Sequence, residues 1–128
     1  MYNIIYLDYY GKPDLVVWYE KPWAKAIRQW LVGQPKPFKR NNIRKYLRGL
    51  GITCKYRSVW HHESHAAAGY YTSPFDDCNV LVIDAIGEWD TISIWEATTE
   101  KKHLGHRTHE LKKIKSWKYP YSLGLLYS

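Results

Sequence analysis

One short aliphatic run limits the fold of this chain more than any other part of its sequence. Residues 79–84 read Asn-Val-Leu-Val-Ile-Asp, so four aliphatic side chains follow one another without a break. A near-continuous run of this kind is typical of a central strand that is covered on both faces. We therefore expect an α/β domain whose central strands are residues 80–84 and the alternating segment 91–97.

Length and composition narrow the class further. The chain has 128 residues, which is enough for one domain but not for two. With 45% hydrophobic and 24% charged residues, it is neither disordered nor collagen-like. Cys54 and Cys78 form no CxxC pair, which excludes a disulfide framework and a four-thiolate zinc site. No segment has the roughly 18 to 20 apolar residues of a membrane span, and no targeting signal opens the chain, so we expect a cytoplasmic protein with no membrane partner.

Proline and glycine residues divide the rest of the chain into predicted elements. In chain order these are a buried strand at 15–18, a helix at 23–31, a helix at 43–50, a strand at 55–60 and a helix at 61–71. Asn41 or Asn42 can cap the second helix, and three consecutive alanines favour the third. The segment 103–118 is too irregular to assign, whereas residues 120–123 predict the start of a helix.

Two histidines in the third predicted helix form the strongest local signal. His61 and His65 are four residues apart, so both rings lie on one helix face within reach of a single metal ion. The alternative is a pair of surface or supporting histidines. The segment is one residue short of the HExxH zinc motif, and it lacks the Pro-Cys-x-x-Cys of the zinc deaminases, so both of those sites are excluded. Two histidines with carboxylates suit iron, zinc or manganese.

A carboxylate follows the aliphatic strand directly. Because a buried and unpaired Asp84 would be costly, we expect it to face a ligand, a metal or a polar cleft at the end of the strand. A simple turn is the alternative. Gly87 permits close approach of the backbone, while spacing alone gives Glu88 no role. The pair Asp76-Asp77 is more typical of a solvated loop.

The net charge of +7 is consistent with an anionic ligand and equally with a solvated basic surface. The basic stretch 112–118, followed by Tyr119 and Tyr121, has the composition of a nucleic-acid-binding segment. A solvated strand face is favoured, because no nucleic-acid motif accompanies the stretch. In addition, three nearby histidines lack zinc-finger partners: His103, His106 and His109.

Five segments, taken in order, resemble the NodU/CmcH carbamoyltransferase family. They are Tyr19-Glu20-Lys21-Pro22, His61-His62-Glu63-Ser64-His65-Ala66-Ala67, Ser73-Pro74-Phe75-Asp76, Ile83-Asp84-Ala85-Ile86-Gly87-Glu88-Trp89 and residues 120–128. Their order and spacing match over nearly the whole chain. The compact, aromatic-rich composition is also similar to that of phage-encoded relatives of the family.

The resemblance implies a partial actin-like (ASKHA, or ribonuclease H-like) domain, with a mixed sheet and flanking helices, related to the Kae1 and HypF carbamoylation domains. Full family members begin with a strand and a His-Asp-x-Ser motif and continue into a YrdC-like domain. Neither part is present here. The resemblance therefore implies that residues 1–128 are a single partial N-terminal (Kae1-like) domain, truncated at both ends and incomplete as an enzyme on its own.

The resemblance also implies an activity. In the family, carbamoyl phosphate is hydrolysed to carbamate, ATP with Mg²⁺ then yields carbamoyl adenylate, and a hydroxyl of a small-molecule acceptor takes the carbamoyl group. The family's HxxxH pair maps onto His61 and His65, and the aspartate of its Asp-Gly-x-Gly-Glu segment maps onto Asp84. These three residues are thereby implied to hold iron or zinc.

The same segment implies catalytic roles for Asp84 and Glu88 and cofactor contacts for Asp84 and Gly87. Ala85 departs from the family's usual glycine, which costs backbone freedom at that position.

Two other interpretations remain open at this point. The chain is consistent with a non-catalytic metal-binding module, or with one half of a split enzyme that a complementing chain or a second copy in a homo-oligomer completes. Either would share the cluster of His61, His65 and Asp84. A basic nucleic-acid-binding protein would instead show steep salt dependence and no role for those three residues.

Overall fold

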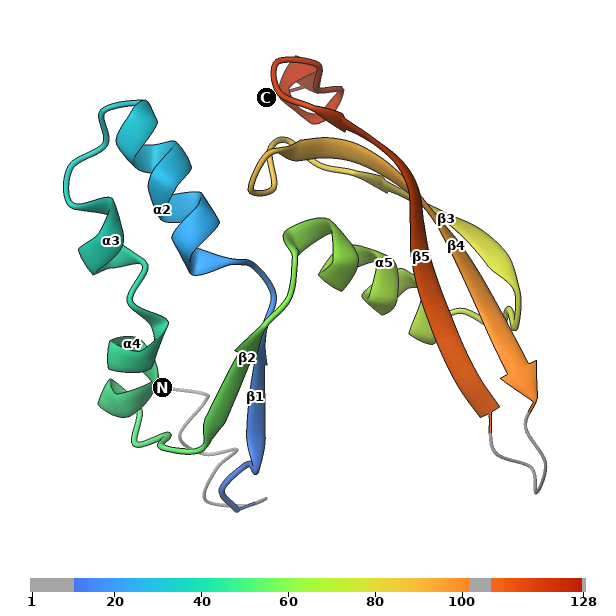
Figure 1. The fold of residues 1–128 in the computed structure, drawn as a ribbon, viewed down its shortest axis with the longest axis horizontal. Coiled ribbons are helices and arrows are strands. Elements are labelled where there is room, and N and C mark those ends of the chain that lie inside the picture. Colours follow the sequence, from blue (N-terminus) through green and yellow to red (C-terminus); the bar gives the residue numbers. More distant parts are fainter. Residues whose placement is uncertain (1–10, 102–106, 128) are drawn as a thin grey trace. The chain divides into compact units, whose positions relative to one another are not determined.

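The computed structural model describes residues 11–101 and 107–127 (Figure 1). They fall into two compact units that divide between Val59 and Trp60. No helix within the described ranges is both long enough and apolar enough to cross a lipid bilayer.

The first unit is a β-α-β arrangement. Its elements are β1 (Leu15–Trp18), α2 (Pro22–Leu31), α3 (Pro37–Arg40), α4 (Ile43–Gly49) and β2 (Lys55–Ser58). The two strands pair in parallel, with Leu15 opposite Lys55 and Trp18 opposite Ser58. Parallel strands need a long crossover, and the three helices provide it.

The helix ends in this unit follow local chemistry. Pro22 is the first residue of α2, where its missing N–H costs nothing, and Gly33 follows the helix at a φ of 74°. The Oδ1 of Asn42 accepts the N–H of Lys45 at 3.0 Å and so caps α4. Gly51, at a φ of 75°, lies just beyond the end of α4. The predicted helices and the Asn42 cap are confirmed.

The strand predicted at 15–18 forms, but the prediction that it is buried is wrong. The exposed fractions of Leu15 and Val17 are 47% and 58%. Alternate side chains of a strand point to opposite faces, and among the described residues only one face of the two-stranded sheet is covered.

The second unit is a three-stranded sheet with one helix packed against it. It consists of α5 (His61–Tyr71), β3 (Cys78–Ile83), β4 (Asp90–Lys101), β5 (Arg107–Lys118) and the 3-10 helix η2 (Gly124–Tyr127). The strand order is β3-β4-β5, and both pairings are antiparallel. Helix α5 packs on β3 and β4, where Ala66, Val82 and Trp95 form the core.

The position of the aliphatic run corrects the prediction that it is a central strand covered on both faces. Within the described residues β3 is an edge strand, and Leu81 and Ile83 are 60% and 51% exposed, whereas Val82 is 6% exposed. The centre of the sheet is β4, which includes the predicted strand 91–97 and continues to residue 101. Only the face that carries α5 is covered, so alternate aliphatic residues face outward.

The C-terminal part of the chain also differs from the sequence pattern. Of the unassigned segment, residues 107–118 form β5, and the helix expected after residue 120 is a single 3-10 turn. His103 and His106 lie outside the described residues. The α/β class is confirmed, with one parallel and one antiparallel sheet in place of a single mixed sheet. The actin-like architecture remains a prediction.

Candidate metal centre

Helix α5 presents both predicted histidine ligands on one face. His61 is its first residue and His65 lies one turn later, with ring centroids 4.6 Å apart. The Glu88 carboxylate accepts the backbone N–H of His61 at 3.1 and 3.2 Å, and the Glu63 carboxylate accepts the N–H of Trp60 at 3.3 Å. A first helical turn leaves such N–H groups unsatisfied, and carboxylates there are favourable. The two glutamates therefore fix where the helix begins.

Asp84 is positioned by the turn that joins β3 to β4. Its backbone N–H donates to the carbonyl of Thr91 at 2.9 Å, which closes the hairpin directly after the strand. Its Oδ1 accepts the N–H of Ala85 at 2.7 Å. A short aspartate side chain often binds the backbone of its own turn in this way. The bond leaves Oδ2 directed at His61.

The three predicted ligands come together at one point. The Nε2 atom of His61 lies 3.0 Å from the Nε2 of His65 and 2.8 Å from the Oδ2 of Asp84. The three ligand atoms all lie within 4.8 Å of one another. The predicted ligand side chains thus form the contact between the first two turns of α5 and the end of β3.

The arrangement fits a divalent metal ion. Metal–nitrogen distances of about 2.0 to 2.1 Å place neighbouring ligand atoms about 3.0 to 3.4 Å apart, close to the 3.0 and 2.8 Å that separate His61 from the other two ligand atoms. Two neutral imidazoles and one carboxylate suit zinc, iron and manganese. The side chains of His61 and Asp84 are 16% and 26% exposed, and His65 is exposed. The cluster therefore has an open side for a further ligand.

Gly87 lies directly against the histidine rings. A Cβ at this position would come within 3.0 Å of the His62 ring and 3.3 Å of the His61 ring. The close backbone approach that we expected at Gly87 is therefore an approach to helix α5. Glu88, which is 5% exposed, holds the start of that helix. The cofactor role of Gly87 and the catalytic role of Glu88 stay predictions.

His62 points into the core and not into the ligand cluster. It is 2% exposed, and its Nδ1 lies 2.7 Å from the hydroxyl of Ser93, which also accepts the indole N–H of Trp95 at 2.7 Å. Its Nε2 has no hydrogen-bond partner among the described residues. Burial lowers the pKa of His62, and this effect exceeds the opposing attraction of Asp90 and Asp84.

The lowered pKa of His62 predicts acid sensitivity of the metal-free protein. The unfolded chain, with a His pKa of 6.5, binds more protons than the folded state below that value. We expect the contribution of His62 to the free energy of unfolding to be constant above this pH and to fall as the pH drops through the folded pKa. Urea unfolding in chelator from about pH 8 to about pH 5 measures this slope. The slope should be shallower in His62→Gln, and an unchanged slope in that variant would contradict the prediction.

A contact that sequence reasoning missed holds the Asp84 turn from the other side. The hydroxyl of Ser122 donates to the carbonyl of Ala85 at 2.7 Å and accepts the N–H of Leu125 at 3.1 Å. Gly124 lies so close that a Cβ there would be 2.5 Å from backbone atoms of Asp84 and Ala85. The only signal in the sequence was the glycine in the segment 120–128.

The remaining acidic candidates and two lysines of the basic stretch have structural partners. Asp76 forms an ion pair with Arg107 at 2.9 Å, and Asp77 accepts the N–H of Thr99 at 2.8 Å, as expected of a loop. Two lysines of the basic stretch lie on tryptophan rings: Lys113 over Trp95 and Lys115 over Trp117. Lys113 also pairs with Asp90 at 3.0 Å. These contacts are typical of an exposed strand face.

Two comparisons with known proteins bear on this site. The family model described as carbamoyltransferase N-terminus matches residues 23–128, which include all three candidate ligands. The uncharacterized protein sll1178 of Synechocystis sp. (strain ATCC 27184 / PCC 6803 / Kazusa) is 32% identical over 142 aligned positions. That alignment covers 90% of this chain and 21% of the relative, so the chain spans about a fifth of that protein's length. The chain belongs to the carbamoyltransferase family, whose N-terminal region it matches.

Proposed function

We propose that this chain supplies the metal-binding part of a carbamoyltransferase active site. His61, His65 and Asp84 would hold one iron or zinc ion. The observation that carries the proposal is the convergence of two Nε2 atoms and one carboxylate oxygen within 4.8 Å, inside a segment that the family model matches. Two histidines and a carboxylate suit iron and zinc, and they also suit manganese.

The proposed reaction moves a carbamoyl group from carbamoyl phosphate to a hydroxyl of a small-molecule acceptor. Water first hydrolyses carbamoyl phosphate to carbamate and inorganic phosphate. A carbamate oxygen then displaces pyrophosphate from the α-phosphorus of ATP, which is bound with Mg²⁺, and so forms carbamoyl adenylate. The acceptor hydroxyl finally loses its proton and displaces AMP from the carbamoyl carbon. When bound, the metal of the three-ligand site supplies positive charge that orients and neutralises phosphate oxygens. Whole-protein activity, acceptor and partners are proposals, because the chain spans about a fifth of its curated relative.

The residues around the site have distinct tasks in this proposal. The local bond from Ala85 fixes one oxygen of Asp84, so that the other faces the two imidazoles. Glu88 holds the first turn of α5 and with it the ring of His61. His65, the exposed member, borders the open side from which phosphate oxygens would approach. The chain thus presents a preformed ligand set that needs little rearrangement to accept charge.

Metal-dependent ATP binding tests the proposal. We expect Zn²⁺ or Mn²⁺ to raise the affinity of the wild-type chain for ATP by about tenfold, as bound metal adds a direct phosphate contact. The measurement is calorimetric titration of ATP with and without metal. The His61→Ala, His65→Ala double variant should lose the increase, because its ligand pair is gone.

His109→Gln serves as the matched control, because His109 lies outside the cluster and contacts Tyr70 and Thr99 instead. It should keep the full metal effect. ATP affinity that metal leaves unchanged in the wild type, while metal itself binds, would favour a metal-binding module without a nucleotide role. An equal metal effect in the double variant would contradict the proposed site.

A further inference from the structure

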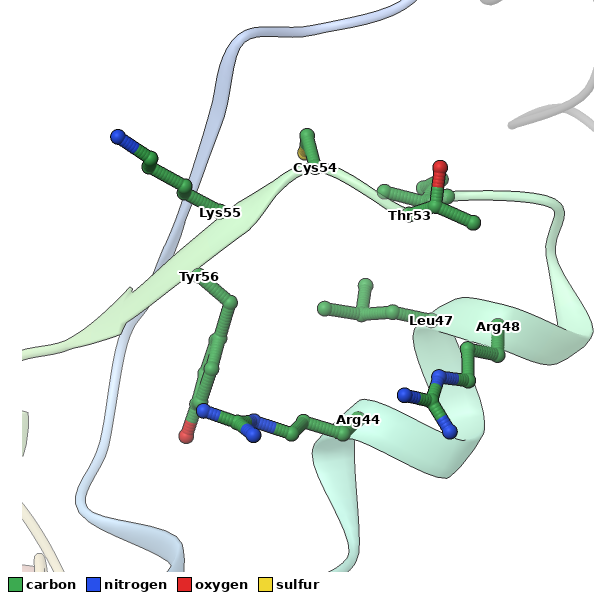
Figure 2. A pocket seen from close by; sticks show the side chains of 8 residues that line it. Arg44, Leu47, Arg48, Thr53, Cys54, Lys55 and Tyr56 are labelled. Carbon is green, nitrogen blue, oxygen red and sulfur yellow. The ribbon is translucent and has the colours of Figure 1, made fainter.

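A cationic pocket lies in the first unit, away in sequence from the metal ligands. It has a volume of about 200 Å³ and is formed by α4, the loop after it and β2 (Figure 2). Its lining residues are Arg44, Leu47, Arg48, Ile52, Thr53, Cys54, Lys55 and Tyr56. No carboxylate is among them, so the pocket is positively charged.

Two arginines dominate the charge of this pocket. Arg44 and Arg48 are one turn apart on α4, which places their side chains on the same helix face. Neither takes part in any of the four ion pairs found among the described residues. Figure 2 shows Arg44 extending towards Tyr56, while the Lys55 side chain points away from both arginines. Neighbouring cations repel each other, and an anion between them would remove that repulsion.

A second pocket adjoins the first through shared residues. Its volume is about 320 Å³, and Arg44 and Tyr56 line both pockets. The rest of its wall is largely apolar and aromatic, including Trp23, Phe38 and Ile43. Trp23 and Phe38 are each 58% exposed. A flat ring can therefore contact aromatic side chains next to the guanidinium groups.

We propose that these two pockets together bind a small aromatic phosphate, with its phosphate at Arg44 and Arg48 and its ring beside Phe38 and Tyr56. Guanidinium groups bind phosphate through paired, charge-assisted hydrogen bonds. Aromatic side chains add stacking to a ligand ring. The second pocket, at about 320 Å³, reaches the size of small-ligand sites, which start at about 300 Å³, and the first adds about 200 Å³. This site uses none of the metal ligands and does not depend on the proposed carbamoyl transfer.

Calorimetric titration of the full chain at low salt tests this proposal, with phenyl phosphate as the probe. Inorganic phosphate and phenol, which each represent one half of the probe, are titrated for comparison. We expect phenyl phosphate to bind about fivefold more tightly than inorganic phosphate, and phenol to bind more weakly than either. Equal affinity for phenyl phosphate and inorganic phosphate would overturn the two-pocket site. Chelator in every titration removes any contribution from the metal centre.

Variants assign the binding to named residues. Arg44→Gln with Arg48→Gln should weaken phenyl phosphate binding about 30-fold, while the lysine pair at the same positions should keep only part of the affinity. The control pair Arg40→Gln with Arg57→Gln removes the same charge from exposed positions outside both pockets. Equal losses in the two glutamine pairs would overturn the proposal in favour of general charge attraction. Phe38→Ala should abolish the preference for phenyl phosphate over inorganic phosphate.

Discussion

A Gly124→Ala variant should be less stable than the wild type and should bind divalent metal more weakly. The added Cβ would lie 2.5 Å from the carbonyl carbon and oxygen of Asp84 and from the nitrogen of Ala85. These are backbone atoms, so no side-chain rotation relieves the overlap. The turn must move away, which breaks the Ser122 bond to Ala85 and shifts the Asp84 carboxylate. We expect a loss of about 3 kcal/mol in the free energy of unfolding.

Gly69→Ala is the matched control for this prediction. Gly69 lies inside α5, and its added Cβ would make an ordinary contact of 3.7 Å with Val80. Alanine in a helix interior is favoured over glycine by about 0.5 to 1 kcal/mol, so this variant should gain stability. Urea unfolding followed by metal titration measures both effects. Wild-type stability and wild-type metal affinity in Gly124→Ala would show that the two backbone segments do not pack as described.

An Asp84→Asn variant should lose metal affinity by about 100-fold or more, because a neutral amide replaces the only anionic ligand of the cluster. The side chain keeps its shape, and its Oδ1 can still accept the Ala85 N–H, so the turn should persist. The loss should therefore appear in binding and not in the folded structure. Fluorescence or calorimetric titration with Zn²⁺ measures it.

Asp76→Asn removes the same charge at an exposed ion pair with Arg107. It should leave metal affinity within about twofold of the wild type, since exposed pairs contribute little. If both asparagine variants lost affinity equally, the effect would come from net charge, and Asp84 would not be a ligand.

Sequence patterns predicted those features of the site that a single helix or a single strand end determines. The spacing of His61 and His65 placed two rings on one helix face, and that helix begins and ends at the expected residues, 61 and 71. A carboxylate that directly follows an aliphatic strand was expected at a polar edge, and Asp84 lies there beside His61. Spacing alone did not predict that the helix and the end of the strand share one metal site. The resemblance of these segments to one family implied it.

The missed features depend on contacts between distant segments. The aliphatic run does not reveal whether a second layer covers Leu81 and Ile83, and among the described residues none does. The sequence shows a glycine at position 124, but it does not show that the backbone there lies against Asp84. The core position of His62, on helix α5, depends on Ser93, a residue of strand β4. Such pairings follow from tertiary packing, which no local rule encodes.

The central claim, a metal centre formed by two histidines and one aspartate, is tested most directly by metal content and affinity. Elemental analysis of the purified chain and titration with Zn²⁺, Fe²⁺ and Mn²⁺ should give about one ion per chain. The His61→Ala, His65→Ala double variant should lose this binding, and His109→Gln should keep it. No saturable binding to the folded wild-type chain, or equal binding to the double variant, would contradict the account.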